Sequence, residues 1–65
     1  MSTARAERYR LKGDDERMGL KAGDILVCVP YWLDPEKLTV LYREGDGFDP
    51  ECNVYRYQVE RLARA

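Results

Sequence analysis

The side chains in this sequence that could do chemistry are two thiols and several carboxylates. The thiols belong to Cys28 and Cys52, and none of the 65 residues is histidine. The chain therefore lacks the side chain that titrates nearest neutral pH, which is also the commonest metal ligand. Two cysteines without a C-x-x-C spacing do not make a conventional zinc site. We expect a protein with no enzymatic activity, no cofactor, no bound metal and no small-molecule substrate.

Two interpretations of the thiols are open. In a reducing compartment, Cys28 and Cys52 would be free thiols in the core, whereas in an exported protein they would form a disulfide bridge. The N-terminus has no apolar run, and the longest apolar stretch, residues 25–33, has nine residues. A membrane span needs about 20 residues. We therefore expect a cytoplasmic protein with reduced cysteines.

The carboxylates gather in two stretches. Residues 14–16 read Asp-Asp-Glu, and an acidic loop carries Glu44, Asp46, Asp49 and Glu51. Their spacing lacks the regular positions and the distal glutamate of a calcium loop. Paired carboxylates can hydrolyse glycosides only in a cleft that excludes water, and so short a chain has little material for such a cleft. We expect solvated loops whose charge attracts a partner with a basic surface.

The strongest candidate for a binding site is the run Tyr31, Trp32 and Leu33. It follows Pro30 at the shoulder of an expected hairpin, and a small core has little room for these side chains. Tryptophan and tyrosine are common interface anchors because they combine a large contact area with few rotatable bonds. The alternative is that Trp32 folds back over the end of the core. The predicted partner-binding residues are Tyr31, Trp32, Leu33, Phe48 and Tyr55.

The charges are balanced in number but not in position. Eleven basic and twelve acidic side chains give a net charge of -1, with basic ends and an acidic middle. If the two ends lie side by side as edge strands, they would form a basic strip. Its members would be Arg8, Arg10, Arg56, Arg61 and Arg64. This strip supports an alternative function, nucleic-acid binding, but the net charge opposes it. We expect a protein partner or self-association.

Short strands must position these residues. After a mobile tail at residues 1–6, Tyr9 and Leu11 alternate with basic side chains and predict a first strand. Residues 25–29 are apolar on both faces and predict the central strand. Residues 7–65 are expected to form a single domain.

The second half of the chain alternates again. Residues 37–44 predict a strand, and an Asp-Pro turn before them predicts a hairpin. One face of this strand is expected to carry Leu38, Val40 and Tyr42, and the other face Thr39, Leu41 and Arg43. Residues 53–57 favour a strand over a helix because aromatic and β-branched side chains dominate. Residues 58–62 predict one helical turn or a short closing strand.

Two segments resemble SH3 domains. Residues 20–26, Leu-Lys-Ala-Gly-Asp-Ile-Leu, are similar to the start of the second strand in such domains, and residues 53–62 are similar to their closing segment. The resemblance implies a mainly β fold, a small five-stranded SH3-like barrel with a short helical turn near the C-terminus.

The position of the tryptophan departs from that pattern. SH3 domains that bind proline-rich peptides have a groove tryptophan after the hairpin turn, whereas Trp32 comes before it. The resemblance therefore does not extend to recognition of proline-rich ligands. In its short length and its acidic and aromatic character, the chain is similar to small accessory proteins of bacteriophages and their actinobacterial hosts.

Overall fold

The computed structural model of the chain describes residues 5–62. Most of the predicted tail and the last three residues of the predicted domain lie outside this range, while residues 5 and 6 are exposed. No helical segment within the described range is long and apolar enough to cross a membrane.

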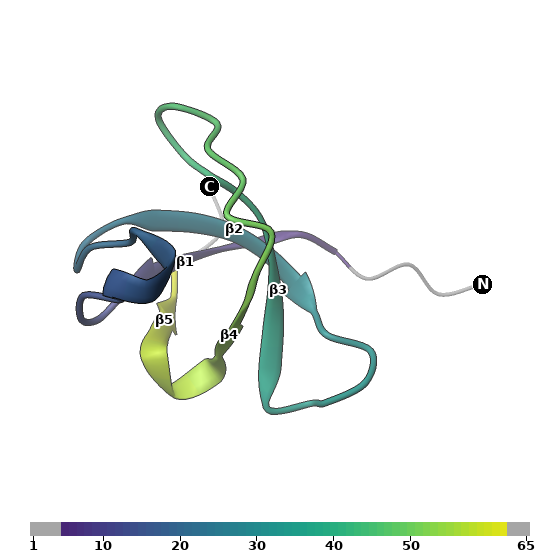
Figure 1. Cartoon of the computed structure of the whole chain (residues 1–65). Coiled ribbons are helices and arrows are strands. Elements are labelled where there is room, and N and C mark those ends of the chain that lie inside the picture. The colour runs from purple at the N-terminus through teal and green to yellow at the C-terminus, as the bar shows by residue number, and fades with distance from the viewer. Residues whose placement is uncertain (1–4, 63–65) are drawn as a thin grey trace.

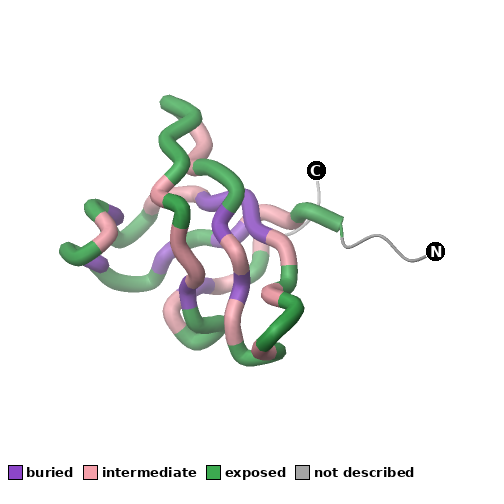
Figure 2. Tube along the Cα trace, turned by 45° about the vertical axis from the view of Figure 1, so that its right-hand side comes forward, coloured by how far each residue is buried: buried purple, intermediate pink, exposed green. Residues whose placement is uncertain are grey.

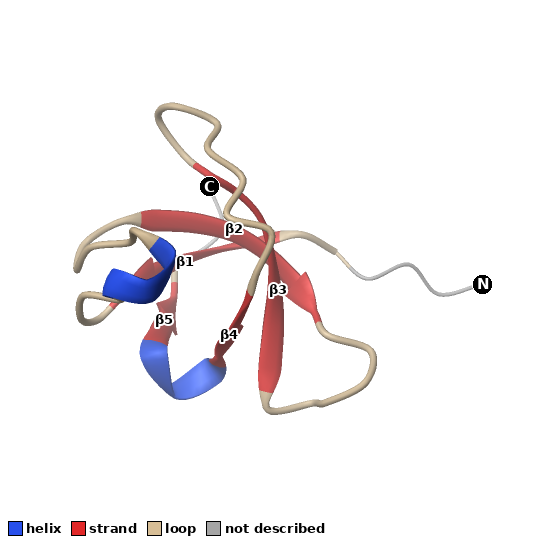
Figure 3. Cartoon of the chain, viewed as in Figure 1, coloured by secondary structure: helices blue, strands red, loops and turns tan. Residues whose placement is uncertain are grey.

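The fold is one antiparallel sheet of five strands, curled into a half-barrel (Figure 1). The strands are β1 (Glu7–Leu11), β2 (Ile25–Pro30), β3 (Lys37–Arg43), β4 (Asn53–Tyr55) and β5 (Val59–Arg61). Their order across the sheet is β4-β3-β2-β1-β5. Two 3-10 turns complete the structure, η1 (Glu16–Met18) and η2 (Arg56–Gln58), as Figure 3 shows. The predicted mainly β fold and the helical turn near the C-terminus are confirmed.

Strand β2 is central, as its sequence predicts, because it is apolar on both faces. Leu26 and Cys28 are buried among the core residues, whereas Val27 between them is buried outside that cluster. The first four residues of β2 pair with β1 and the last five pair with β3. Pro30 has no amide hydrogen to donate, and β2 ends there.

The core lies on the inner side of the curled sheet. Alternate residues of each strand point to this side. The buried positions therefore follow the strands, while most loop residues are exposed (Figure 2). The core residues are Tyr9, Leu11, Leu20, Leu26, Cys28, Leu38, Val40, Val54 and Val59. Met18 and Cys52 pack against this cluster.

A bulge in β3 changes which side chains point outward. Val27 on β2 is opposite Tyr42, but the next residue, Cys28, is opposite Val40, so Leu41 is an extra residue on β3. A bulge interrupts the alternation of side chains along a strand. Tyr42 is consequently 43% exposed while Leu38 and Val40 are buried, so the expectation that the three share one face is wrong for Tyr42. Leu41, next to it, is 40% exposed.

The last part of the chain runs as strand, turn and strand. The predicted strand over residues 53–57 is wrong in its last two residues, because β4 ends at Tyr55 and η2 follows. The Gln58 side chain accepts a hydrogen bond from the Tyr55 amide at 2.8 Å, which turns the chain away from the sheet. Strand β5 then pairs with β1. Of the two expectations for residues 58–62, the closing strand is confirmed.

Candidate functional site

Several apolar side chains gather at one end of the sheet. Trp32 and Leu33 lie on the connection between β2 and β3, residues 31–36, and are 84% and 60% exposed. Tyr55 and Tyr57, at η2, are 41% and 72% exposed. We call the set Tyr31, Trp32, Leu33, Tyr55 and Tyr57 the aromatic end. Figure 1 shows that the 31–36 connection and η2 both lie toward the same end of the sheet.

Hydrogen bonds join the two halves of the aromatic end. The Arg56 amide donates to the Glu36 carbonyl at 2.9 Å, and the Arg56 Nε donates to the Pro35 carbonyl at 2.7 Å. Both carbonyls belong to the 31–36 connection, while Arg56 begins η2. The two segments that carry the aromatic end are therefore held together, although they are far apart in the sequence.

A tight turn keeps Trp32 out of the core. The Asp34 side chain accepts a hydrogen bond from the Glu36 amide at 2.9 Å. The Asp34 carbonyl accepts one from the Lys37 amide at 3.0 Å, which closes the turn that the Asp-Pro pair predicts. Trp32 lies just before this turn. The alternative that its indole covers the core does not occur, because the side chain is 84% exposed.

The two tyrosines of the aromatic end form a stacked pair. Their ring centroids are 5.2 Å apart and their planes meet at 21°. The Lys37 Nζ lies 5.0 Å from the Tyr55 centroid, within range of a cation–π interaction. Tyr57, which the predicted partner-binding set leaves out, thus belongs to this surface. The sequence feature that links Tyr57 to Tyr55 is their separation by two residues.

A shallow groove of about 340 Å³ runs beside Tyr57. Its lining residues are Lys12, Gly13, Asp14, Tyr57 and Gln58. One wall belongs to the loop between β1 and β2, residues 12–24, and the other belongs to η2. The groove is not visible in the sequence, because only the tertiary structure brings its two walls together.

Phe48 does not lie with the aromatic end. The 31–36 connection precedes β3 and the acidic loop follows it, so the two are separated by the seven residues of β3, roughly 20 Å of strand. The Arg43 guanidinium lies 4.8 Å from the centroid of the Phe48 ring. The five predicted partner-binding residues therefore divide into two surfaces, with Phe48 alone on the second.

The acidic loop is tied to its own basic neighbours. Arg43 forms an ion pair with Asp46 at 2.5 Å, and Arg8 forms one with Glu44 at 2.7 Å. The Asp46 side chain also accepts a hydrogen bond from the Phe48 amide at 2.9 Å. Two of the four predicted acidic residues are thus partly neutralised within the chain.

The Arg43 and Asp46 pair leads to a prediction about acid stability. The hydrogen bond from Arg43 lowers the pKa of Asp46 from 3.8 to about 2, helped by the bond from the Phe48 amide. Because the pKa is lower in the folded state, the stabilisation is present above about pH 4 and is lost as the pH falls toward 2. Asp46→Asn should remove this part of the pH dependence of unfolding. Urea denaturation at several pH values measures how the free energy of unfolding depends on pH. An NMR titration in which the Asp46 carboxyl has its midpoint near pH 4 would contradict the prediction.

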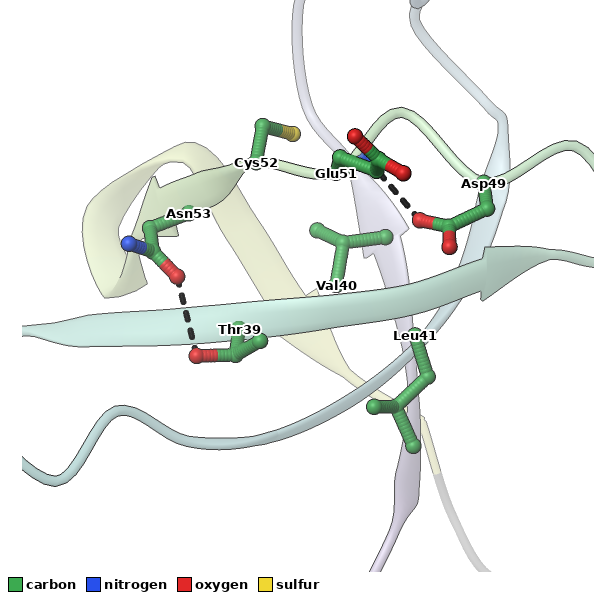
Figure 4. Close-up of a pocket in the computed structure, with 7 residues that line it drawn as sticks. All are labelled: Thr39, Val40, Leu41, Asp49, Glu51, Cys52 and Asn53. Carbon is green, nitrogen blue, oxygen red and sulfur yellow. Dashed lines mark hydrogen bonds between the residues drawn. The ribbon is translucent and has the colours of Figure 1, made fainter.

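The other two acidic residues line a second hollow, of about 310 Å³ (Figure 4). It is lined by Thr39, Val40, Leu41, Asp49, Glu51, Cys52 and Asn53. The Asp49 carboxylate accepts a hydrogen bond from the Glu51 amide at 2.9 Å. Figure 4 shows Val40 and Leu41 on opposite sides of β3. Residues 5–62 contain no cluster of three or more side chains placed to hold a metal ion.

The cysteines are free thiols. Cys28 is opposite Val40, and the Val40 amide donates to the Cys52 carbonyl, so the cysteines lie two strands apart. That separation is about 10 Å, whereas a disulfide needs its Cα atoms within about 7 Å. Burial raises the pKa of the Cys28 thiol to about 12 and also raises that of Cys52. The disulfide alternative would require the sheet to rearrange.

Alkylation should distinguish the two thiols. Cys28 is 1% exposed, while Cys52 is half-buried, and only an accessible thiolate reacts readily. Iodoacetamide at pH 8 should modify Cys52 slowly and leave Cys28 intact, whereas urea should allow both to react. Intact-mass measurement over time gives the number of alkylated thiols, and peptide mapping shows which cysteine is alkylated. Equal rates for the two thiols in the native protein would contradict the burial of Cys28.

The basic strip is largely neutralised. Strands β1 and β5 lie side by side, as expected for the two ends of the chain. Three of the five arginines form ion pairs: Arg8 with Glu44, Arg10 with Glu60, and Arg61 with Glu7. Arg56 donates to the Pro35 carbonyl, and Arg64 lies outside the described residues. A nucleic-acid phosphate would have to compete with these carboxylates.

No protein-family model, no curated protein and no solved structure matches the chain.

Proposed function

We propose that this protein is a non-enzymatic binding module that holds another protein, or a second copy of itself, through the aromatic end. One observation carries the proposal: the Trp32 side chain is 84% exposed. Water contact with an indole and neighbouring apolar groups is unfavourable, and covering them stabilises a complex. Leu33, next in sequence, and Tyr57 on η2 are also exposed at this end of the sheet.

The architecture also supports a binding role. The strand order β4-β3-β2-β1-β5, with a 3-10 turn before the last strand, agrees with the SH3-like arrangement that the sequence resembles. In such small domains, function depends on surface loops, because the core is too small to enclose a substrate. The groove beside Tyr57 adjoins the aromatic end and offers further contact area.

The acidic loop is at the other end of β3 and takes no part in the same contact. Glu44 and Asp46 are held by Arg8 and Arg43. We assign the acidic loop a secondary role, in which its net negative charge favours approach of a basic partner. Nucleic-acid binding is not preferred, because three arginines of the basic strip already have carboxylate partners.

The test compares the intact protein with variants that lack one exposed ring. Light scattering after size exclusion first determines whether the chain associates with itself. Immobilised intact protein, Trp32→Ala and Phe48→Ala are then used to capture partners, with quantification by mass spectrometry. The proposal predicts at least one partner, or a second copy, that binds the intact protein and Phe48→Ala but not Trp32→Ala. It fails if every captured protein and the oligomeric state are the same for all three.

A further inference from the structure

Gln58 makes three hydrogen bonds that join η2 to other parts of the fold. Its side-chain oxygen accepts a hydrogen bond from the Tyr55 amide at 2.8 Å, and its side-chain nitrogen donates to an Asp15 carboxylate oxygen at 3.3 Å. Its backbone carbonyl accepts a bond from the Lys12 amide at 2.8 Å. One residue of η2 therefore contacts the end of β4 and two points on the 12–24 loop.

Asp15 is the partner that makes this arrangement unusual. It is 8% exposed and is the only buried charged residue among those that the structure describes. Removing a carboxylate from water is costly unless hydrogen bonds replace the lost hydration. Among residues 5–62, the side-chain amide of Gln58 is the group that donates a hydrogen bond to the Asp15 carboxylate. Without that bond, the carboxylate would be better solvated by moving outward.

The backbone around Asp15 links its position to the rest of the loop. Its amide and carbonyl bond to the Leu20 carbonyl and amide at 2.8 and 3.0 Å. The neighbouring Asp14 side chain accepts a bond from the Ala22 amide at 2.9 Å. Outward movement of Asp15 would therefore disturb both sets of bonds, and with them one wall of the groove beside Tyr57.

We propose that the hydrogen bond between Asp15 and Gln58 is a latch that holds the 12–24 loop against η2. With the latch closed, Gly13 and Asp14 on one wall face Tyr57 and Gln58 on the other. With the latch open, the segment around Asp14 and Asp15 is free to move away from η2 and the groove widens, while the Lys12 bond to the Gln58 carbonyl and the buried Leu20 still anchor the loop on either side of that segment. This device follows from the contacts of the free protein and does not depend on the proposed function.

Exchanging the donor and the acceptor provides a specific test. Gln58→Glu keeps an acceptor for the Tyr55 amide but places a second carboxylate against Asp15. The double variant Asp15→Asn and Gln58→Glu reverses the pair, so that the new amide donates to the new carboxylate. Amide hydrogen exchange at neutral pH then reports on the loop through Leu20 and Ala22. Val40, whose amide bonds to Cys52 in another part of the sheet, is the control.

In Gln58→Glu, the Leu20 and Ala22 amides should exchange roughly tenfold faster or more, which is the size of effect expected from losing a hydrogen bond to a charged group. Exchange at Val40 should change much less, and the double variant should restore protection of the loop. The latch is overturned if Gln58→Glu leaves the loop amides unchanged, or if all amides accelerate equally. It is also overturned if the double variant remains as unprotected as Gln58→Glu.

Discussion

Leu38→Ala is expected to leave most of the protein unfolded at 25 °C. Leu38 is fully buried and lies on β3 between its neighbours Pro30 on β2 and Val54 on β4. Replacing a buried leucine by alanine costs about 2–5 kcal/mol, because apolar contacts are lost and a cavity remains. A core of this size seldom supplies more than about 3–5 kcal/mol in total. Urea denaturation followed by circular dichroism measures the loss.

Leu33→Ala is the matched control for this effect. The chemical change is identical, but Leu33 is 60% exposed on the 31–36 connection. Exposed substitutions usually alter stability by no more than about 0.5 kcal/mol. Equal unfolding midpoints for Leu38→Ala and Leu33→Ala would mean that β3 does not cover the core as described.

The second large effect is expected in binding rather than in folding. Trp32→Ala should weaken capture of the partner, or of a second copy, by about 30-fold or more. This corresponds to about 2 kcal/mol, the usual cost of truncating an aromatic anchor in an interface. Because the indole is 84% exposed, the unfolding midpoint should stay close to that of the intact protein. Titration calorimetry with the purified partner, or sedimentation for self-association, measures the affinity.

Phe48→Ala separates a specific role of Trp32 from a general effect of losing an aromatic ring. Phe48 is also exposed, but it lies beyond the other end of β3, beneath Arg43. Its loss should leave the affinity within about twofold, since energetically dominant contacts cluster in one part of an interface. If Phe48→Ala weakens binding as much as Trp32→Ala does, the binding surface is not the aromatic end.

The strands were predictable because their signals are local. Tyr9 and Leu11 alternate with charges, and residues 25–29 are apolar without interruption, so both segments are identifiable from their own side chains. The turn before β3 is similarly encoded by Asp34 and Pro35, which favour turns wherever they occur. For these elements, the tertiary structure agrees with the local preference.

The bulge in β3 was not predictable from alternation. Leu38, Val40 and Tyr42 form a regular period of two in the sequence. The extra residue becomes visible only when β3 is aligned against β2, where the partners shift between Val27 and Cys28. Alternation within one strand carries no information about its register with another. The outward position of Tyr42 is therefore a property of the strand pair.

The sequence indicated several of the aromatic residues that are exposed, but not which of them lie together in the fold. Trp32 and Leu33 are exposed as the small core suggested. Phe48 and Tyr55 are both aromatic, however, and their residue types do not show that they lie at different ends of β3. The neutralisation of the basic strip was hidden for the same reason: Arg8 and Glu44 are 36 residues apart and meet across the sheet.

The pairing of β1 with β5 has a consequence for how the protein is made. Tyr9 is opposite Arg61, so β1 receives its second neighbour only from β5, about fifty residues later in the chain. During translation, β1 can pair with β2 early, but its other edge keeps unsatisfied amides and carbonyls until residue 61 has left the ribosome. An open edge of this kind can pair with strands of other chains. The free edge of β1 therefore remains open to misassembly for as long as β5 is missing or unpaired.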